Sequence, residues 1–324
     1  MLSIDTYREA FLSFLNKQVA VKEPENLYNP MVYILNLGGK RLRPVLTLMS
    51  AEIFGEDHSK ALDAALAIEI FHNFSLVHDD IMDAAPLRRG KATVHEKWNL
   101  NTGILSGDVM LIVAYRFFEN YRPEIFQKLA RLFSKTAIEV CEGQQYDIDF
   151  ETRNDVTEQE YLKMITYKTA VLVGAAMKMG AIVAETSEEQ AQAIYDFGLN
   201  LGIAFQLKDD FLDAFGDPET FGKQVGGDII ENKKTYLYLK ALEGLDNEHT
   251  ARLKSLYNTT PDSPAEKILE VKKLMRQSGA AAITQKAIET YTDKAFAVLS
   301  KLEIPDHKKA VLREFGEQLM GRTV

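Results

Sequence analysis

The chain has 324 residues, 46% of them hydrophobic and 26% charged, an ordinary composition for a globular protein that buries a substantial core. Its 38 basic and 47 acidic residues give a formal net charge of −9, which argues against a general nucleic-acid binder, because such proteins present a basic face. The single cysteine, Cys141, excludes an intramolecular disulfide and favours a cytoplasmic location. The longest apolar stretch, residues 171–184, is short and contains Lys178, so we expect no membrane span.

Helical patterns dominate the chain. No Asn-Gly or Asp-Gly hairpin dipeptide occurs, and the prolines stand at plausible helix boundaries or in first turns. The patterns predict helices over 3–18, 29–37, 41–54, 59–83, 102–120, 123–149, 158–184, 188–215, 228–243, 247–258, 263–278, 280–302 and 305–320.

Three of these helices carry a capping-box start, because Thr157, Ser187 and Ser263 each precede a Glu or Gln by three residues. The segments 62–77 and 197–207 are apolar nearly all round and are expected to be central. Residues 246–320 are amphipathic, charged on the outside, and are interpreted as packing. Because no linker or composition shift divides the chain, the prediction is one all-α domain over residues 1–324.

Residues 71–90 read FHNFSLVHDDIMDAAPLRRG and hold the first chemical motif. On a helix, Asp79 and Asp83 share one face and Asp80 lies beside them. Carboxylates this close repel one another, and Mg²⁺ relieves the repulsion while keeping waters and recruiting substrate phosphates. Arg88 and Arg89 then supply planar cations suited to phosphate. The pattern indicates a metal-bridged diphosphate; the alternative is a solvated acidic helix end followed by a basic loop.

The same spacing recurs in FQLKDDFLD at 205–213, where Asp209, Asp210 and Asp213 follow another apolar run. Two copies on two separate helices can face each other across a cavity. The recurrence therefore weakens the solvated-helix alternative and favours a metal site.

Cations gather in three other places. In NLGGKRLRP at 36–44, a glycine pair precedes a helix start flanked by cations, where anions are favoured; the alternative is a basic solvated turn. Lys168 interrupts an apolar face and could instead extend to solvent. The segment 216–235 reads as a loop over a site, with lysines that could reach a diphosphate, although a plain surface loop would also be rich in lysine.

These motifs, in this order, resemble those of the trans-isoprenyl diphosphate synthases, or polyprenyl synthetases. The resemblance runs from GGKRLRP at 38–44 through DDIMD and RRG at 79–90, KT at 168–169 and FQLKDDFLD at 205–213 to GK and GGD at 222–228. It implies an all-α, single-domain isoprenoid synthase bundle of about ten core helices around a deep central cavity. It also implies a homodimer.

The resemblance also implies a role for each site residue. Three Mg²⁺ ions would be held by Asp79, Asp80, Asp83, Asp209, Asp210 and Asp213. Isopentenyl diphosphate would be held by Lys40, Arg43, His72 and Arg89, and the allylic diphosphate by Arg88, Lys168 and Lys223. Thr169 and Gln206 would line the cavity near the reacting carbons, and Lys233, or else its neighbour Lys234, would close over the metal cluster.

The implied reaction is an Mg²⁺-dependent 1′-4 condensation of isopentenyl diphosphate with dimethylallyl, geranyl or farnesyl diphosphate, by ionisation, condensation and elimination. Phe74 argues against very long products, and Ser75 leaves more depth than the paired aromatics of animal farnesyl synthases. A C20 product, geranylgeranyl diphosphate, is therefore favoured narrowly over C15 farnesyl diphosphate. One alternative is a class I terpene cyclase, which would not need a second diphosphate site. The other is a silent regulatory subunit of a heteromeric prenyl synthase, in which motif residues are usually lost.

Overall fold

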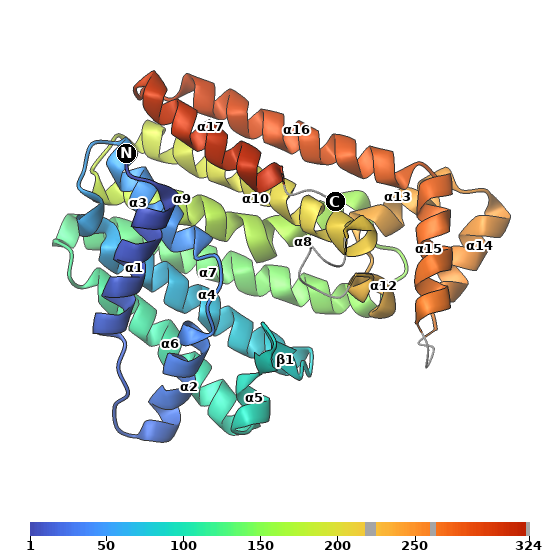
Figure 1. The fold of residues 1–324 in the computed structure, drawn as a ribbon, viewed down its shortest axis with the longest axis horizontal. Coiled ribbons are helices and arrows are strands. Elements are labelled where there is room, and N and C mark those ends of the chain that lie inside the picture. The colour runs from blue at the N-terminus through green and yellow to red at the C-terminus, as the bar shows by residue number, and fades with distance from the viewer. Residues whose placement is uncertain (218–224, 260–263, 322–324) are drawn as a thin grey trace. The chain divides into compact units, whose positions relative to one another are not determined.

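The computed structural model describes residues 1–217, 225–259 and 264–321. The regular elements of these residues are helices, apart from one hairpin of two-residue strands (Figure 1). This confirms the predicted all-α class. The chain divides into two compact units, residues 1–136 with 172–195 (unit 1) and residues 137–171 with 196–324 (unit 2). The long helices α7 (Pro123–Thr152) and α10 (Glu188–Phe215) contribute residues to both units. None of the helices described is long and apolar enough to cross a membrane.

Unit 1 is built around α4 (Leu62–Met82), whose residues from Ala64 to Phe71 are all buried. The prediction that 62–77 is a central helix is therefore confirmed for this unit. Around α4 lie α1 (Ile4–Gln18), α2 (Glu25–Asn36), α3 (Leu42–Ile53), η1 (His58–Ala61), β1 (Leu87–Arg88), β2 (Lys91–Ala92), α5 (Val94–Lys97), α6 (Leu100–Phe118) and α9 (Val171–Val183).

Glycines allow the helices of unit 1 to approach closely. A Cβ on Gly180 of α9 would collide with the backbone of α3 at Thr47 and Ala51. On α6, a Cβ on Gly103 would lie 2.9 Å from Ile81 Cδ1, and one on Gly107 would overlap the His78 imidazole. The α4 segment that leads into the first aspartate motif is thus packed directly on α6.

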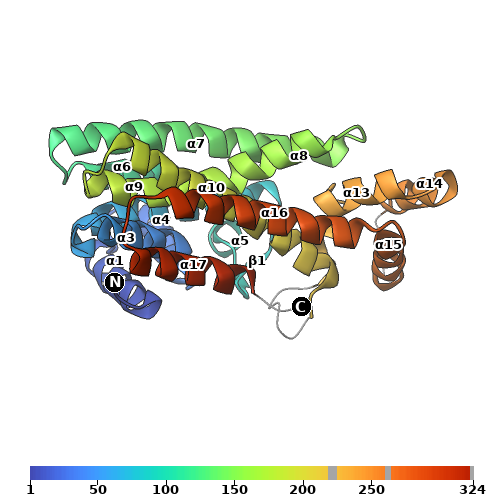
Figure 2. The ribbon, with the colours of Figure 1, turned by 90° about the horizontal axis from the view of Figure 1, so that it is seen from above.

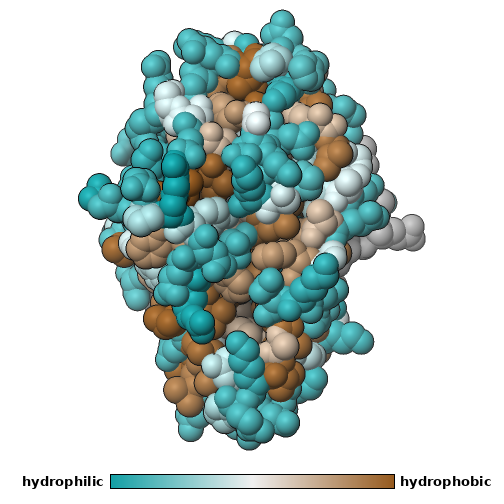
Figure 3. All heavy atoms as spheres, turned by 90° about the vertical axis from the view of Figure 1, so that its left-hand side faces the viewer, coloured by the Kyte–Doolittle hydropathy of each residue, from teal (hydrophilic) through white to brown (hydrophobic). Residues whose placement is uncertain are grey.

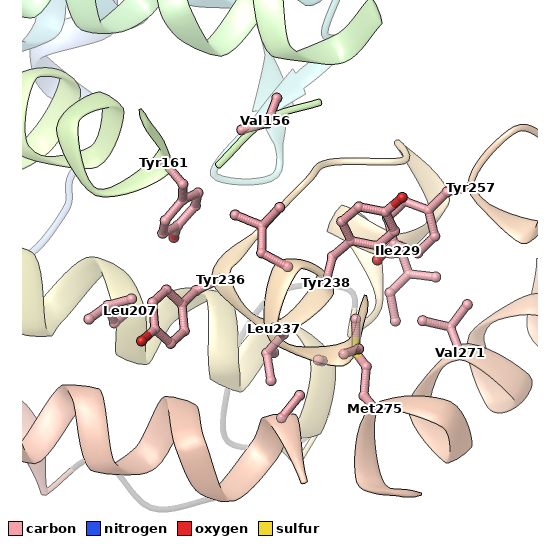
Figure 4. Close-up of a cluster of buried hydrophobic side chains, with 14 of the residues drawn as sticks. Val156, Tyr161, Leu207, Ile229, Tyr236, Leu237, Tyr238, Tyr257, Val271 and Met275 are labelled. Atoms are coloured by element: carbon pink, nitrogen blue, oxygen red, sulfur yellow. The ribbon is translucent and has the colours of Figure 1, made fainter. Parts of the chain in front are cut away.

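Unit 2 surrounds a hydrophobic cluster to which α13 contributes Tyr236, Leu237 and Tyr238 (Figure 4). Its other members come from α7, α8, η2, α10, α12 and the helices that follow α13. The two C-terminal helices, α16 and α17, lie side by side (Figures 1 and 2), and Gly316 of α17 lies against Phe296 of α16. The further elements of the unit are α8 (Glu158–Ile165), η2 (Thr166–Ala170), α12 (Gly227–Ile230), α13 (Tyr236–Gly244), α14 (Asn247–Leu256), α15 (Ala265–Gln277), α16 (Ala280–Lys301) and α17 (Asp306–Met320).

Hydrophobic side chains also reach the surface. On α6, Leu100, Ile104, Leu105 and Ile112 are exposed. Figure 3 shows one face of the molecule, on which hydrophobic residues form patches between hydrophilic ones.

Three local predictions need correction. The helix predicted over 228–243 is wrong, because α12 ends at Ile230 and Asn232 adopts a left-handed φ of 60° before α13 begins at Tyr236. The second helix starts at Glu25 rather than at residue 29, so Pro30 lies inside it and not in its first turn. The helix predicted over 158–184 contains a π-helical turn at 166–170, formed by i→i+5 hydrogen bonding.

The capping predictions fared better. The Thr157 side chain accepts from the Glu160 backbone, and the Glu160 carboxylate accepts from the Thr157 backbone, so the capping box of α8 is confirmed. Ser187 Oγ accepts from the Gln190 backbone N–H. Ser263 lies outside the described residues.

Candidate active site

The first aspartate motif ends α4, and Arg88 from the following hairpin is bound to it. Asp80 is only 1% exposed, and Arg88 Nε donates to both of its carboxylate oxygens at 2.8 Å. Arg88 Nη2 lies 2.6 Å from Asp80 Oδ1 and 3.7 Å from Asp79 Oδ2. Asp83 caps the helix and is exposed. The structure therefore brings four of the predicted residues together, with one carboxylate already paired to a cation.

The hairpin places the two arginines. Leu87 pairs with Ala92 and Arg88 with Lys91, and the turn between the strands has positive φ at both Arg89 (53°) and Gly90 (72°), as in a type I′ turn. Two side chains hold the hairpin in place: Thr93 Oγ1 donates to Ala85 O at 2.7 Å, and the Tyr33 hydroxyl donates to Ala92 O at 2.7 Å. Arg88 ends the first strand and Arg89 begins the turn, and their guanidinium groups bind different partners, Asp80 and Gly38 O.

The Arg89 guanidinium extends to the glycine turn between α2 and α3. Its Nη1 donates to Gly38 O. Gly38 and Gly39 have φ of 85° and 111°, and a Cβ on Gly39 would lie 2.8–2.9 Å from the Arg89 guanidinium atoms. The positive φ angles favour glycine at both positions, and a side chain at residue 39 would also displace the Arg89 guanidinium. Lys40 follows and is exposed.

A buried imidazole lies among these cations. Arg43 Nη1 is 3.2 Å from His72 Nε2. Burial, followed by the charges of Arg43 and Arg89, holds the pKa of His72 well below its usual value, so its imidazole is neutral near pH 7. Burial also lowers the pKa of Arg43 to about 10, and Arg89 adds to this effect. Four of the predicted residues (Lys40, Arg43, His72 and Arg89) thus form a cation-lined turn suited to an anion.

Arg41 belongs to the same sequence motif but has a different role. It is buried, and its guanidinium donates to Glu69 Oε1 at 2.5 Å and to Leu35 O. Asn73 Nδ2 also donates to Glu69 Oε1, at 3.1 Å. Arg41 therefore anchors the turn to α4, while its neighbours face outward. Sequence reasoning grouped it with the anion-binding cations, because the pairing with Glu69 joins residues 28 positions apart.

The second aspartate motif lies on α10 in unit 2, and its central carboxylate is buried in a chain of hydrogen bonds. Asp210 is 8% exposed and accepts from Gln206 Nε2 at 2.8 Å and from the Tyr161 hydroxyl. Thr169 Oγ1 donates to Gln206 Oε1 at 3.1 Å. The predicted residues Thr169, Gln206 and Asp210 are therefore linked by consecutive hydrogen bonds, and the hydrogen bond from Tyr161 to Asp210 extends this chain.

The π-helical turn η2 carries Lys168 and Thr169. Such turns add one residue to a helix and are frequent at functional sites, because they redirect the side chains they carry. Lys168 Nζ donates to Asp147 Oδ2 of α7 at 2.5 Å, while Thr169 bonds to α10.

A cavity of about 120 Å³ lies beside this chain of residues within unit 2. Its lining includes residues that sequence reasoning had proposed and others that it had missed. The proposed ones are Lys168, Thr169, Gln206, Asp210, Lys233 and Lys234; the missed polar ones are Asp147, Glu151, Tyr161, Asp228 and Thr235. Asp228 stands in the GGD motif and Asp147 in the acidic run QQYDIDFE, so a signal for both was present, whereas nothing in the sequence marks Tyr161.

In the described part of the chain, four carboxyl groups, those of Asp147, Glu151, Asp210 and Asp228, line this cavity. Burial, with the nearby carboxylates of Asp209 and Asp213, raises the pKa of Asp210 to about 7, although Tyr161 and Gln206 oppose the shift. Burial and the charges of Asp210 and Asp213 raise the pKa of Asp228 well above its usual value. Burial by itself lowers the pKa of Lys233, but Glu231 and Asp228 outweigh burial and raise it overall.

These groups fit a divalent cation shared with a ligand. A cation that binds between carboxylates which repel one another lowers their electrostatic energy, because part of the repulsion is replaced by attraction. Among the residues that the structure describes, no three His, Cys, Asp or Glu side chains are arranged to hold an ion by themselves. Mg²⁺ is bound in this manner, by one or two carboxylates together with waters and substrate phosphates. Lys223 lies outside the described residues.

Asp213 has an additional structural role. Its Oδ2 accepts from the Asp228 backbone N–H at 3.0 Å, and its carbonyl accepts from the Gly226 N–H at 2.7 Å. The last aspartate of the motif thus ties the start of α12, and with it Asp228, to α10.

An all-α fold with two carboxylate clusters and a cation-lined turn defines a class of protein, a helical enzyme suited to phosphorylated substrates and divalent cations. The family model for polyprenyl synthetase matches residues 24–275. The chain belongs to the polyprenyl synthetase family and is a prenyltransferase that acts on isoprenyl diphosphates.

Individual relatives agree with this assignment. Geranylgeranyl diphosphate synthase of Methanosarcina mazei is 42% identical over 231 residues, covering 71% of each chain. The crystal structure of a geranylgeranyl pyrophosphate synthase matches with a TM-score of 0.96 and 56% identity, over all of both chains. A polyprenyl synthase of Caulobacter crescentus, crystallised with calcium and isoprenyl diphosphate, matches with a TM-score of 0.87 and 29% identity, over 99% of this chain and 98% of that one.

Proposed function

We propose that this prenyltransferase condenses isopentenyl diphosphate with an allylic diphosphate in an Mg²⁺-dependent 1′-4 reaction, and that its main product is C20 geranylgeranyl diphosphate. The observation that carries the proposal is the cation-lined turn formed by Lys40, Arg43, His72 and Arg89. A chain that binds one allylic diphosphate through its aspartates has no need of a second anion site. The turn therefore favours a synthase with two diphosphate substrates over a terpene cyclase.

In the proposed mechanism, isopentenyl diphosphate binds at the cation-lined turn. A neutral His72 donates or accepts a hydrogen bond without adding charge, while Arg43 and Arg89 supply the cations. Because Arg89 also holds Gly38 O, the ligand meets a turn whose backbone is already ordered. The ordering reduces the entropy that binding must overcome.

The allylic diphosphate binds through Mg²⁺ and through Arg88, Lys168, Lys223 and Lys233. The Mg²⁺ ligands are Asp79, Asp80, Asp83, Asp209, Asp210 and Asp213, and three ions are expected. When bound, Mg²⁺ stabilises the charge of the departing diphosphate. Calcium in the Caulobacter crescentus relative supports a divalent cation in this family.

Lys233 is a better candidate than Lys234 for the diphosphate contact. The Lys234 ammonium is buried and donates to Glu151 O at 2.5 Å. Lys233 lies in the field of Asp228 and Asp147 at the cavity, and its ion pair with Glu231 is partly exposed. A partly exposed pair is exchanged for a diphosphate at little cost.

Product length is assigned to the end of α4 that precedes the first motif. Phe74 is 8% exposed, with its ring 5.5 Å from that of Phe71 and 4.8 Å from that of His78. Ser75 Oγ donates to His72 O at 2.8 Å and fills little space. A packed aromatic beside a small residue supports a floor of intermediate depth. The names of the Methanosarcina mazei relative and of the 56% identical structure support C20.

We further propose a cytoplasmic homodimer. Leu105 and Ile112 stand seven residues apart on one face of α6 and are 58% and 59% exposed. Asp108 and Arg116 are exposed on the same helix. In a two-fold arrangement such a face meets itself, so its apolar residues are buried and its opposite charges can pair. Sedimentation of wild-type protein and of a Leu105→Glu variant tests this; monomeric wild-type protein contradicts it.

The reaction is tested with purified protein, Mg²⁺, isopentenyl diphosphate and, separately, dimethylallyl, geranyl or farnesyl diphosphate. The products are dephosphorylated and sized by chromatography and mass spectrometry. A C20 prenol is expected; we also expect longer products from Phe74→Ala and shorter ones from Ser75→Phe. A C15 limit in the wild type would leave the reaction intact and refute the depth assignment.

Two other outcomes identify the alternatives. A cyclic hydrocarbon from the allylic substrate alone would indicate a terpene cyclase. Absence of elongation from every starter, with folded protein and metal present, would indicate a regulatory subunit.

A further inference from the structure

Unit 2 contains a buried lysine that belongs to neither aspartate motif. Lys267 of α15 is 3% exposed, and its ammonium donates to Asn232 Oδ1 at 2.6 Å, to Thr259 O at 2.9 Å and to Ile230 O at 3.5 Å. All three acceptors are neutral. Burying a charge is costly. Among the residues that the structure describes, the three oxygens match the three donors of the ammonium, and the Tyr257 ring lies 5.8 Å from it.

Two of those acceptors belong to the turn that interrupts the predicted helix over 228–243. Ile230 ends α12, and Asn232 has a left-handed φ of 60°. The next residue is Lys233, whose backbone N–H donates to Asp228 O at 2.9 Å and whose side chain lines the cavity. Lys267 therefore holds, through Ile230 and Asn232, the turn that leads into Lys233.

The neighbour of Lys267 contacts the other end of the same segment. A Cβ on Gly226, which has a φ of 87°, would lie 2.9 Å from Ile268 Cδ1. Gly226 N donates to Asp213 O, and Asp228 N donates to the Asp213 carboxylate. The segment 226–232 is thus held on one side by the second aspartate motif and on the other by α15.

We propose that Lys267 is a positioning residue for the allylic diphosphate site, which acts by fixing the turn at Ile230 and Asn232 so that the Lys233 ammonium remains at the cavity. The inference rests on the proposed contact between Lys233 and the allylic diphosphate. It also revises the interpretation of residues 246–320 as packing alone, since one side chain of that region controls a group of the site.

The test compares Lys267→Met with Lys273→Met, which removes an exposed lysine from the same helix. Steady-state kinetics with geranyl diphosphate and isopentenyl diphosphate give a KM for each substrate. For Lys267→Met we expect the KM for geranyl diphosphate to rise about tenfold while the KM for isopentenyl diphosphate changes less than about twofold. Lys273→Met should match the wild type in both.

A second variant separates the contact from the folding of the turn. Asn232→Gly removes the side-chain acceptor, while glycine tolerates the positive φ. It should raise the KM for geranyl diphosphate in the same direction, and the double variant with Lys267→Met should show less than the sum of the two effects, because both changes remove one interaction. Additive effects would contradict the inference. If Lys267→Met does not fold, Asn232→Gly by itself remains a test, and an unchanged KM for geranyl diphosphate in that variant would overturn the inference.

The Lys233→Met variant separates this inference from the proposal on which it rests, the contact between Lys233 and the allylic diphosphate. An unchanged KM for geranyl diphosphate in Lys233→Met would overturn the role of Lys233 and the inference with it. An impaired Lys233→Met beside a Lys267→Met variant that matches the wild type would overturn the inference alone. Equal increases in both KM values for Lys267→Met, with a lower melting temperature, would show a merely structural lysine and also overturn it.

Discussion

The two aspartate motifs have the same spacing, and burial raises the pKa of the central aspartate in each, but the partners of that aspartate differ. In the first, the buried Asp80 is paired with Arg88, a permanent cation. In the second, the buried Asp210 accepts hydrogen bonds from the Tyr161 hydroxyl and the Gln206 amide. The nearby charges that raise its pKa are carboxylates. The buried carboxylate of the first motif already has a cationic partner, whereas the hydrogen-bond donors described for the buried carboxylate of the second motif are neutral.

The difference suggests a division of labour within the proposed site. A carboxylate paired with arginine must exchange partners before it binds metal, and the released arginine is then available to a phosphate. A carboxylate that is uncompensated gains directly from an incoming cation. In the proposed site, Asp80 would therefore couple metal binding to diphosphate binding through the released Arg88, whereas Asp210 would bind metal without releasing a cation.

The largest effect is expected from replacing each buried aspartate by asparagine. Asp80→Asn and Asp210→Asn should each lower kcat by about 10³-fold or more, because a metal ligand is lost. When metal is absent, the two substitutions should change the free energy of unfolding in different directions. Asp80→Asn removes the charge that pairs closely with Arg88, which keeps its longer 3.7 Å contact with Asp79, and should lower the free energy of unfolding by about 1–3 kcal/mol. Asp210→Asn removes a repelled buried charge and should leave stability at pH 8 unchanged or higher. Equal destabilisation of both would contradict the comparison.

The next effect is the pH dependence of stability in chelator-treated protein. The pKa of Asp210 is about 7 in the folded state against 3.8 as the usual value. Because the folded-state pKa is the higher one, the protonated Asp210 carboxyl stabilises the folded state. This contribution to the free energy of unfolding is complete below pH 3.8 and is lost as pH rises through about 7. Between these pH values the free energy of unfolding of the wild type should fall by a few kcal/mol, as measured by urea unfolding. We expect the Asp210→Asn variant not to show this fall. Excess Mg²⁺ should oppose the same loss in the wild type, and an identical pH profile in wild type and variant would refute this.

A smaller effect should follow from Tyr161→Phe. The Tyr161 hydroxyl lowers the pKa of Asp210 by hydrogen bonding, so its removal should raise that pKa. In the proposed reaction, Asp210 must be ionised to bind metal. The acid limb of the pH–rate profile should therefore move upward by about one pH unit, as expected for one hydrogen bond. A profile that keeps its position while the rate falls uniformly would show that Tyr161 acts in another way.

The smallest effect concerns the short helix that carries Tyr161. Thr157→Ala removes the N-cap of α8 and should cost about 1 kcal/mol of stability, seen as a slightly lower melting temperature. The looser helix should also shift the acid limb in the same direction as Tyr161→Phe, but less. Ser187→Ala, which weakens the start of α10, is the matched control. It should lower stability similarly and leave the acid limb unchanged, and a shift of the same size in the control would refute the link.

Much of the fold was predictable because helices and caps depend on local sequence. The apolar run of α4, the capping box at Thr157 and the spacing of both aspartate motifs all act within a few residues. The break after Ile230 was not predicted. It depends on Lys267, which lies 37 positions away from Ile230 and 35 from Asn232. Local propensity does not register such a partner, and tertiary contacts decide the outcome.

The candidate site divides in the same way. The sequence by itself determined which residue types were present, that each motif would lie on a helix, and which family the chain resembled. Only the tertiary structure decided that Asp80 is paired with Arg88, that Asp210 bonds to Tyr161 across 49 positions, and that Arg41 is an anchor bound to Glu69. The physical reason is that helical periodicity is a local property of the chain, whereas burial, hydrogen-bond partners and pKa depend on groups that only folding brings together.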